Sequence, residues 1–125
     1  MKNILLIAGA GAVGTILRYL AVKATDLLHW NYPVGTLIVN VLGAFTAGFC
    51  WVWIKNKFPQ YETYYPIFFV GFLGAFTTFS TFALESARFL LDSEYGKFIT
   101  NILLQNCSGI AAAVLGITIA KIFLS

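Results

Sequence analysis

The sequence of 125 residues is 59% hydrophobic and 10% charged, and its mean hydropathy is +0.82. A soluble domain carries about 25% charged residues. This composition therefore excludes a soluble domain and indicates an integral membrane protein. The formal net charge is +3, but the eight basic residues are scattered and form no patch. We therefore expect no nucleic-acid partner. At about 20 residues per span, the length allows four helices.

Four apolar segments cover about residues 3–24, 33–54, 65–91 and 98–123, and they predict an all-α fold in one domain, residues 1–125. The first segment begins like a signal peptide, with Lys2 before an apolar run. No cleavage-site pattern follows, so we expect the segment to remain as a helix. Arg18 is unusual near the end of this span. Its side chain could reach the membrane interface, form a structural ion pair or serve an ion vestibule.

In the second segment Thr36, Asn40 and Gly43 share one helical face, because they are spaced at i, i+4 and i+7. Asn40 is the only amide of this span. Its donors and acceptor would go unpaired in hydrocarbon, so we expect the side chain to face the bundle interior. The pattern leaves open whether Asn40 only joins helices by hydrogen bonding or also contributes to a site.

The third segment contains the most unusual stretch, residues 71–82, with two glycines, four hydroxyl residues and four phenylalanines. This composition predicts a helix broken at membrane depth, which is tolerated only where protein or an aqueous cavity lines the break. Phe76, Phe79 and Phe82 recur at every third position, a spacing that puts their rings near one helical face. We interpret the break and this aromatic face as the candidate site.

Polar residues continue beyond this stretch. Glu85 could pair with Arg88 on the same helix, or with Arg18 of the first helix. The fourth segment carries a stripe of polar residues on one helical face, namely Asn101, Gln105 and Ser108. A narrow aqueous route needs such a stripe, although hydrogen bonding between helices would explain it as well.

The basic residues predict an unusual topology. Four spans place both termini and the middle connection on one side of the membrane. Lys2, Lys55, Lys57 and Lys121 then face Arg18, Lys23, Arg88 and Lys97 on the other side. The excess of Lys and Arg that orients membrane proteins is absent. We therefore expect insertion in both orientations and an antiparallel two-fold homodimer.

Motifs in three of the segments resemble the CrcB/Fluc family of fluoride channels over essentially the whole chain. They comprise Gly14, Thr15, Arg18 and Tyr19, then Gly35, Thr36, Leu37, Val39, Asn40, Gly43 and Phe45, and finally Gly71, Phe72, Gly74, Thr77, Thr78, Phe79, Ser80, Thr81 and Phe82. The resemblance implies a dual-topology homodimer in the plasma or inner cell membrane, whose two antiparallel pores export toxic fluoride passively. It also implies a structural sodium ion at the dimer centre, held by backbone carbonyls at Gly74 and Thr77.

The resemblance assigns roles to side chains too. Phe79 and Phe82 resemble the family's phenylalanine box, Asn40 resembles its pore asparagine, and Ser80 and Thr81 match its hydroxyl track. These roles agree with physical chemistry. The edge of an aromatic ring is positive and can face an anion. A small anion that leaves water also needs new hydrogen-bond donors. The predicted pore is completed by Thr36, Gln105 and Ser108, with Arg18 and Glu85 as structural or vestibule residues. Family members often carry a tyrosine and serines on the pore side of the fourth helix. This chain departs from the family there, because it has Asn101, Gln105 and Ser108, or alternatively Asn106, at that side.

Three other classes compete with this interpretation. The alternative of a small four-helix multidrug or cation exporter requires a carboxylate buried in the first span, and this sequence has none there. A membrane enzyme needs a nucleophile with its base or a metal cluster. One histidine in a connection and two scattered cysteines supply neither, so we do not expect an enzyme. A purely structural subunit would account for the small-residue faces but not for the hydroxyl-rich break with its phenylalanines.

Overall fold

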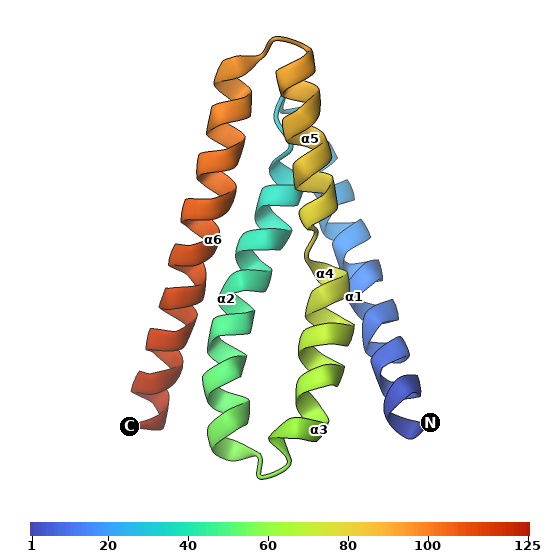
Figure 1. Cartoon of the computed structure of the whole chain (residues 1–125), viewed down its shortest axis with the longest axis vertical. Coiled ribbons are helices and arrows are strands. Elements are labelled where there is room, and N and C mark those ends of the chain that lie inside the picture. The colour runs from blue at the N-terminus through green and yellow to red at the C-terminus, as the bar shows by residue number, and fades with distance from the viewer.

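The computed structural model describes all residues, 1–125, and every regular element is a helix (Figure 1). The elements are α1 (Lys2–Asp26), α2 (Val34–Lys57), α3 (Tyr61–Tyr65), η1 (Pro66–Leu73), α4 (Gly74–Phe76), α5 (Phe79–Leu91) and α6 (Tyr95–Leu124). With α3 to α5 taken together, four helical segments are long and apolar enough to cross a membrane, with hydropathies of 1.8 to 2.0. The predicted all-helical class and its four membrane-spanning helices are confirmed.

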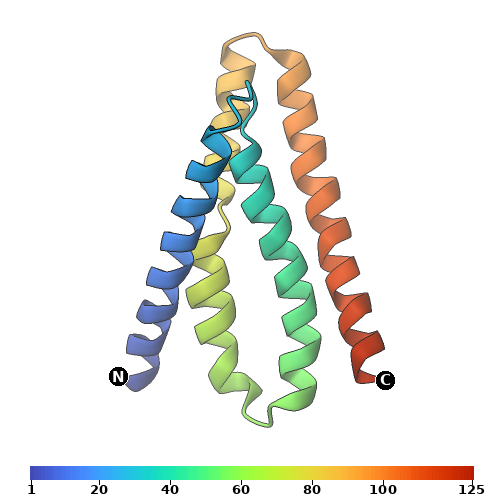
Figure 2. The ribbon, with the colours of Figure 1, turned by 180° about the vertical axis from the view of Figure 1, so that it is seen from behind.

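The two termini and the connection between α2 and α3 lie at one end of the bundle, as Figures 1 and 2 show. The other two connections lie at the opposite end, which we call the outer end. The most extensive contacts join α2 to α6 and α1 to η1, while α5 packs on α6. Three elements, α2, α5 and α6, therefore approach one another toward the outer end.

Glycines allow these helices to pack backbone against backbone. A Cβ atom at Gly48 of α2 would collide with the backbone of Ala113 on α6, and one at Gly116 would collide with the carbonyl of Phe45. On the other side of the bundle, a Cβ atom at Gly14 would meet the carbonyl of Phe72. Small residues hold membrane helices together in this way, because close approach replaces the hydrophobic effect that lipid does not provide.

The helical backbone conformation of the third span is interrupted at two residues. Thr77 has ψ of 160°, and Thr78 has φ of −148° and ψ of 110°, so both are extended. Just before the interruption, η1 has the wider turns of a π-helix, and the Gly74 amide donates to the carbonyls of Phe69 and Gly71. The third span is thus two helices in series, which end and begin inside a membrane-spanning segment.

This interruption corrects the expected face of three phenylalanines. Phe76 lies in α4, where its ring stacks on Phe72 with centroids 5.9 Å apart. Phe79 and Phe82 lie in α5, and their rings meet edge to face at 5.7 Å and 62°. The expectation assumed one continuous helix. Because the extended residues lie between 76 and 79, only Phe79 and Phe82 form a pair.

Candidate functional site

Asn40 of α2 binds both backbone groups of Thr78. Its Oδ1 accepts from the Thr78 N–H at 2.8 Å, and its Nδ2 donates to the Thr78 carbonyl at 3.1 Å. Backbone groups at membrane depth need partners, because no water is available in the hydrocarbon. The Asn40 amide provides both partners, and it fixes the extended residue against α2.

Thr78 also caps the helix that follows it. Its Oγ1 accepts from the Thr81 N–H at 3.3 Å and donates to the Thr81 Oγ1 at 2.9 Å. Threonine is a favoured N-cap because its hydroxyl satisfies an amide that the helix cannot. The N-terminus of α5, which carries partial positive charge, therefore begins within the membrane-spanning segment beside Asn40. The sequence motif included Thr78 but gave it no site role, and a hydroxyl residue before a helical run was the available signal.

Gln105 of α6 is the next member of this polar group. Its Oε1 accepts from Asn40 Nδ2 at 3.0 Å, and its side chain is buried, with 8% of its surface exposed. The Thr78 N–H must meet the Asn40 oxygen, so Asn40 turns its nitrogen toward Gln105, and Gln105 turns its oxygen toward Asn40. The remaining Gln105 nitrogen, Nε2, is buried and has no hydrogen-bond partner. The site thus holds one donor nitrogen whose N–H groups have no partner.

A cavity of about 520 Å³ lies against these residues. Its lining includes Asn40, Thr78 and Gln105 together with both rings of the Phe79 and Phe82 pair. Phe79 is 78% exposed in the single chain. The predicted residues Asn40, Phe79, Phe82 and Gln105 are therefore brought together, from three different helices, around one space.

Other predicted pore residues lie elsewhere. Thr36 donates to Glu85 Oε1 at 2.5 Å. Thr81 belongs to the cap of α5. It lines a separate cavity of about 550 Å³, which Arg18 also lines. Ser80 is exposed, and Ser108 donates to the Leu104 carbonyl of its own helix. Neither serine lines the cavities around the site. Their predicted roles in the pore remain predictions.

Both ion pairs considered for Glu85 are absent. The single salt bridge of the chain joins Lys97 to Glu94 at 2.8 Å. Glu85 accepts instead from Thr36, and its Oε2 has no partner. Arg18 lines the same cavity of about 550 Å³ as Glu85 but donates through Nη1 to the carbonyl of Thr77 at 3.3 Å. The Thr77 carbonyl lies outside a helix, so its lone pairs accept no helical hydrogen bond and are available to the guanidinium of Arg18.

The two carbonyls predicted to hold sodium differ in their surroundings. In a continuous helix the Thr78 amide would donate to the Gly74 carbonyl, but here it donates to Asn40. The Gly74 carbonyl is therefore available, at the negative C-terminal end of α4, and a hard cation suits it. The Thr77 carbonyl already accepts from the cationic Arg18. The donor chemistry fits a sodium ion, with Arg18 as a competitor for one of its ligands.

A second polar group lies at the outer end, where Tyr32 from the α1–α2 connection reaches α6. The Tyr32 hydroxyl donates to Asn101 Oδ1 at 3.0 Å, and its ring stacks on Phe89 at 6.1 Å. Burial and the nearby charge of Glu85 raise the pKa of Tyr32 above its ordinary value, so the hydroxyl keeps its proton. Asn101 in turn donates to Ser86 at 3.1 Å.

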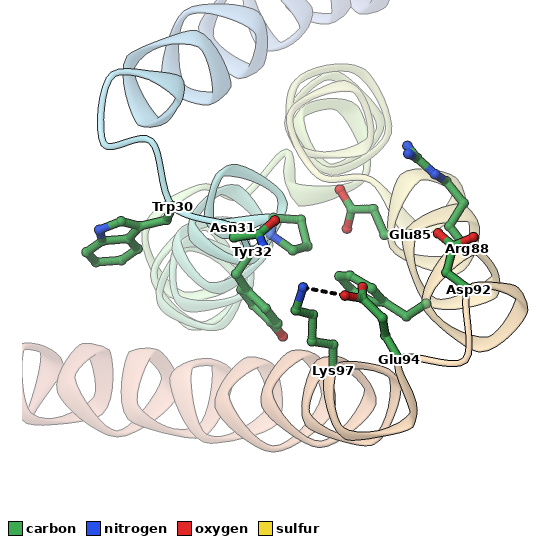
Figure 3. Close-up of a pocket in the computed structure, with 10 residues that line it drawn as sticks. Trp30, Asn31, Tyr32, Glu85, Arg88, Asp92, Glu94 and Lys97 are labelled. Carbon is green, nitrogen blue, oxygen red and sulfur yellow. Dashed lines mark hydrogen bonds and ion pairs between the residues drawn. The ribbon is translucent and has the colours of Figure 1, made fainter.

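Figure 3 shows Tyr32 among the residues that line a cavity of about 420 Å³ at the outer end. Tyr32 and Glu85 face the hollow, Arg88 points away from it, and Lys97 is joined to Glu94. The sequence interpretation gave no role to Tyr32 or Ser86. Tyr32 lies in a connection, where helical spacing carries no information, whereas Ser86 follows Phe82 at i+4 and this spacing was the available signal.

Comparison with known proteins agrees with the resemblance seen in the motifs. The family model described as "CrcB-like protein, Camphor Resistance (CrcB)" matches residues 5–117. The chain belongs to this family. It is 40% identical to a protein of Legionella pneumophila (strain Paris) over 118 residues, covering 94% of this chain and 88% of the relative. It is 40% identical to a protein of Desulforapulum autotrophicum over 117 residues, covering 93% and 94%. It is 37% identical to a protein of Caulobacter vibrioides (strain NA1000 / CB15N) over 123 residues, covering 97% of both. Each of these relatives is named "Fluoride-specific ion channel FluC". With its four membrane-spanning helical segments, the chain is a multi-pass membrane protein.

Proposed function

We propose that this CrcB-like protein is a channel that lets fluoride cross the membrane passively. The relatives described above carry the name of a fluoride-specific channel. The observation in this chain that supports the proposal best is the unpartnered Nε2 of Gln105, buried beside the Phe79 and Phe82 rings. An unpaired buried donor is costly, and a small anion would satisfy it.

The surroundings of Gln105 favour an anion of this kind. The N-terminus of α5 adds partial positive charge, and the edges of aromatic rings are positive. Fluoride leaving water needs several hydrogen-bond donors, and these groups replace part of its hydration. No free cation lines this cavity. Binding that is favourable but not too strong is what conduction requires, because the ion must also leave.

We further propose that two chains form an antiparallel dimer with two pores. The equal division of basic residues supports dual topology, because neither side of the chain carries the excess that sets orientation. Phe79, which lines the cavity, is largely exposed in the single chain, so a second copy would enclose it. Two-fold symmetry would bring the same surface of each chain together.

A structural sodium ion at the dimer centre is part of this proposal. The carbonyls of Gly74 and Thr77 from two chains would hold it, and the ion would neutralise the negative ends of two α4 helices. Arg18 contacts one of these carbonyls at 3.3 Å, so its guanidinium would share that oxygen or be displaced. The sodium ion would hold the two chains together, whereas the polar group around Gln105 would contact fluoride.

The proposed function is tested by measuring efflux from liposomes that contain the purified protein. Liposomes loaded with fluoride should empty much faster than liposomes without protein, and liposomes loaded with chloride should retain their contents. Fluoride efflux no faster than from empty liposomes would overturn the proposal. Equal efflux of fluoride and chloride would overturn its specificity.

A further inference from the structure

Tyr32 is joined to the aromatic pair of the site by a directed chain of hydrogen bonds. Its hydroxyl donates to Asn101 Oδ1, Asn101 Nδ2 donates to Ser86 Oγ, and Ser86 Oγ donates to the Phe82 carbonyl. The three distances are 3.0, 3.1 and 2.9 Å. The chain runs from a connection outside the membrane spans, through α6, to the residue of α5 whose ring lines the cavity at Gln105.

The direction of each bond follows from the one before it. The Ser86 proton goes to the Phe82 carbonyl, so Ser86 Oγ accepts and the nitrogen of Asn101 faces it. The oxygen of Asn101 then faces Tyr32, and only a donor satisfies it there. Asn101 is fully buried, with 0% of its surface exposed. Without the Tyr32 hydroxyl, this oxygen would be left unpaired in the bundle interior, which is costly.

The location of Asn101 connects the two polar groups. It is one helical turn from Gln105 on the same face of α6, and both side chains are buried. The outer cavity of about 420 Å³ is lined by Tyr32 and Glu85, and the inner one contains Phe82 and Gln105. Along α6, Asn101 lies between Lys97, which lines the outer cavity, and Gln105, which lines the inner one.

We propose that Tyr32 is a positioning residue of the ion pathway, which orients the Asn101 amide and, through Ser86, fixes α5 at Phe82. This inference rests on the proposed fluoride channel. Tyr32 does not bind the ion in this account. Its hydroxyl sets the separation of α5 from α6 at the outer end, and its ring, stacked on Phe89, holds the hydroxyl in place.

The test compares Tyr32→Phe with Tyr95→Phe at less than one channel per liposome. Tyr32→Phe keeps the stacked ring and loses only the hydroxyl. Tyr95, which begins α6 nearby, is 59% exposed and its hydroxyl makes no hydrogen bond, so it is a matched control. At this dilution the amplitude of efflux reports the fraction of liposomes with a folded channel, and the rate reports conduction by each channel.

We expect Tyr32→Phe to slow fluoride efflux about fivefold, the factor that corresponds to one lost hydrogen bond, with the amplitude unchanged. Tyr95→Phe should match the unmodified protein. The double variant Tyr32→Phe, Asn101→Ala should be no slower than Asn101→Ala, because both changes break the same chain. An unchanged rate in Tyr32→Phe, a loss of amplitude only, or effects that multiply in the double variant would overturn the inference. Fast efflux by the unmodified protein keeps these outcomes separate from failure of the proposed function.

Discussion

Replacing Gln105 by glutamate turns the one unpartnered donor atom of the site into an acceptor, while the size and shape of the side chain are kept. One carboxylate oxygen can still accept from Asn40, as Oε1 does at 3.0 Å, so the support of the broken helix is retained. The other oxygen stands where Nε2 has no partner. A position that offered an N–H to an anion then presents a negative charge.

The magnitude follows from burial and distance. Gln105 is 8% exposed, so an effective dielectric constant of about 20 applies. A fluoride ion about 3 Å from the new oxygen would be repelled by about 5 kcal/mol. Each 1.36 kcal/mol changes a rate about tenfold, so fluoride flux should fall by roughly three to four orders of magnitude.

The assay is fluoride efflux per active liposome, with two companion variants. Gln105→Met removes the donor without adding charge, and we expect a loss of about tenfold to a hundredfold, because hydrogen bonds to charged groups contribute about 1.5–3 kcal/mol. Gln60→Glu makes the same change of charge in the connection before α3 and should leave the flux unchanged. Flux in Gln105→Glu within about tenfold of the unmodified protein would show that fluoride does not approach Gln105.

Three further predictions concern the aromatic pair, the cation and the topology. Phe82→Ile should abolish fluoride flux while the protein still elutes as a dimer, because the positive ring edge is lost; normal flux would remove the aromatic pair from the pathway. Replacing sodium by N-methylglucamine throughout purification should lower the melting temperature, since an ion at 100 times its Kd stabilises the bound form by about 2.7 kcal/mol; equal melting in both buffers would contradict the sodium site. A tag at the C-terminus should be accessible from both sides of the membrane, and a tag found on one side only would contradict dual topology.

Much of the fold could be predicted from the sequence, because membrane spans depend on composition and length. The four helical segments, and the grouping of Asn40, Phe79, Phe82 and Gln105, follow from apolar runs, helical spacing and the family motif. Spacing alone could not separate Gln105 from Ser108, since both lie on one face of α6. Only Gln105 meets Asn40, and Asn40 is oriented by the backbone of Thr78.

The remaining features depend on contacts that spacing does not encode. Glu85 accepts from Thr36 of α2 and forms neither of the ion pairs considered. Arg18 reaches a backbone carbonyl, which no side-chain pattern indicates. Tyr32 reaches Asn101 of α6 from the α1–α2 connection, where helical spacing carries no information.

Passive fluoride conduction is measured most directly as the current through single channels in a planar bilayer with a fluoride gradient and equal chloride. Passive conduction of fluoride predicts a current whose reversal potential moves about 59 mV for each tenfold change in the fluoride ratio. A reversal potential that stays at zero, or that follows a chloride gradient instead, would contradict the account. An absence of current alongside fluoride movement would indicate coupled exchange rather than a channel.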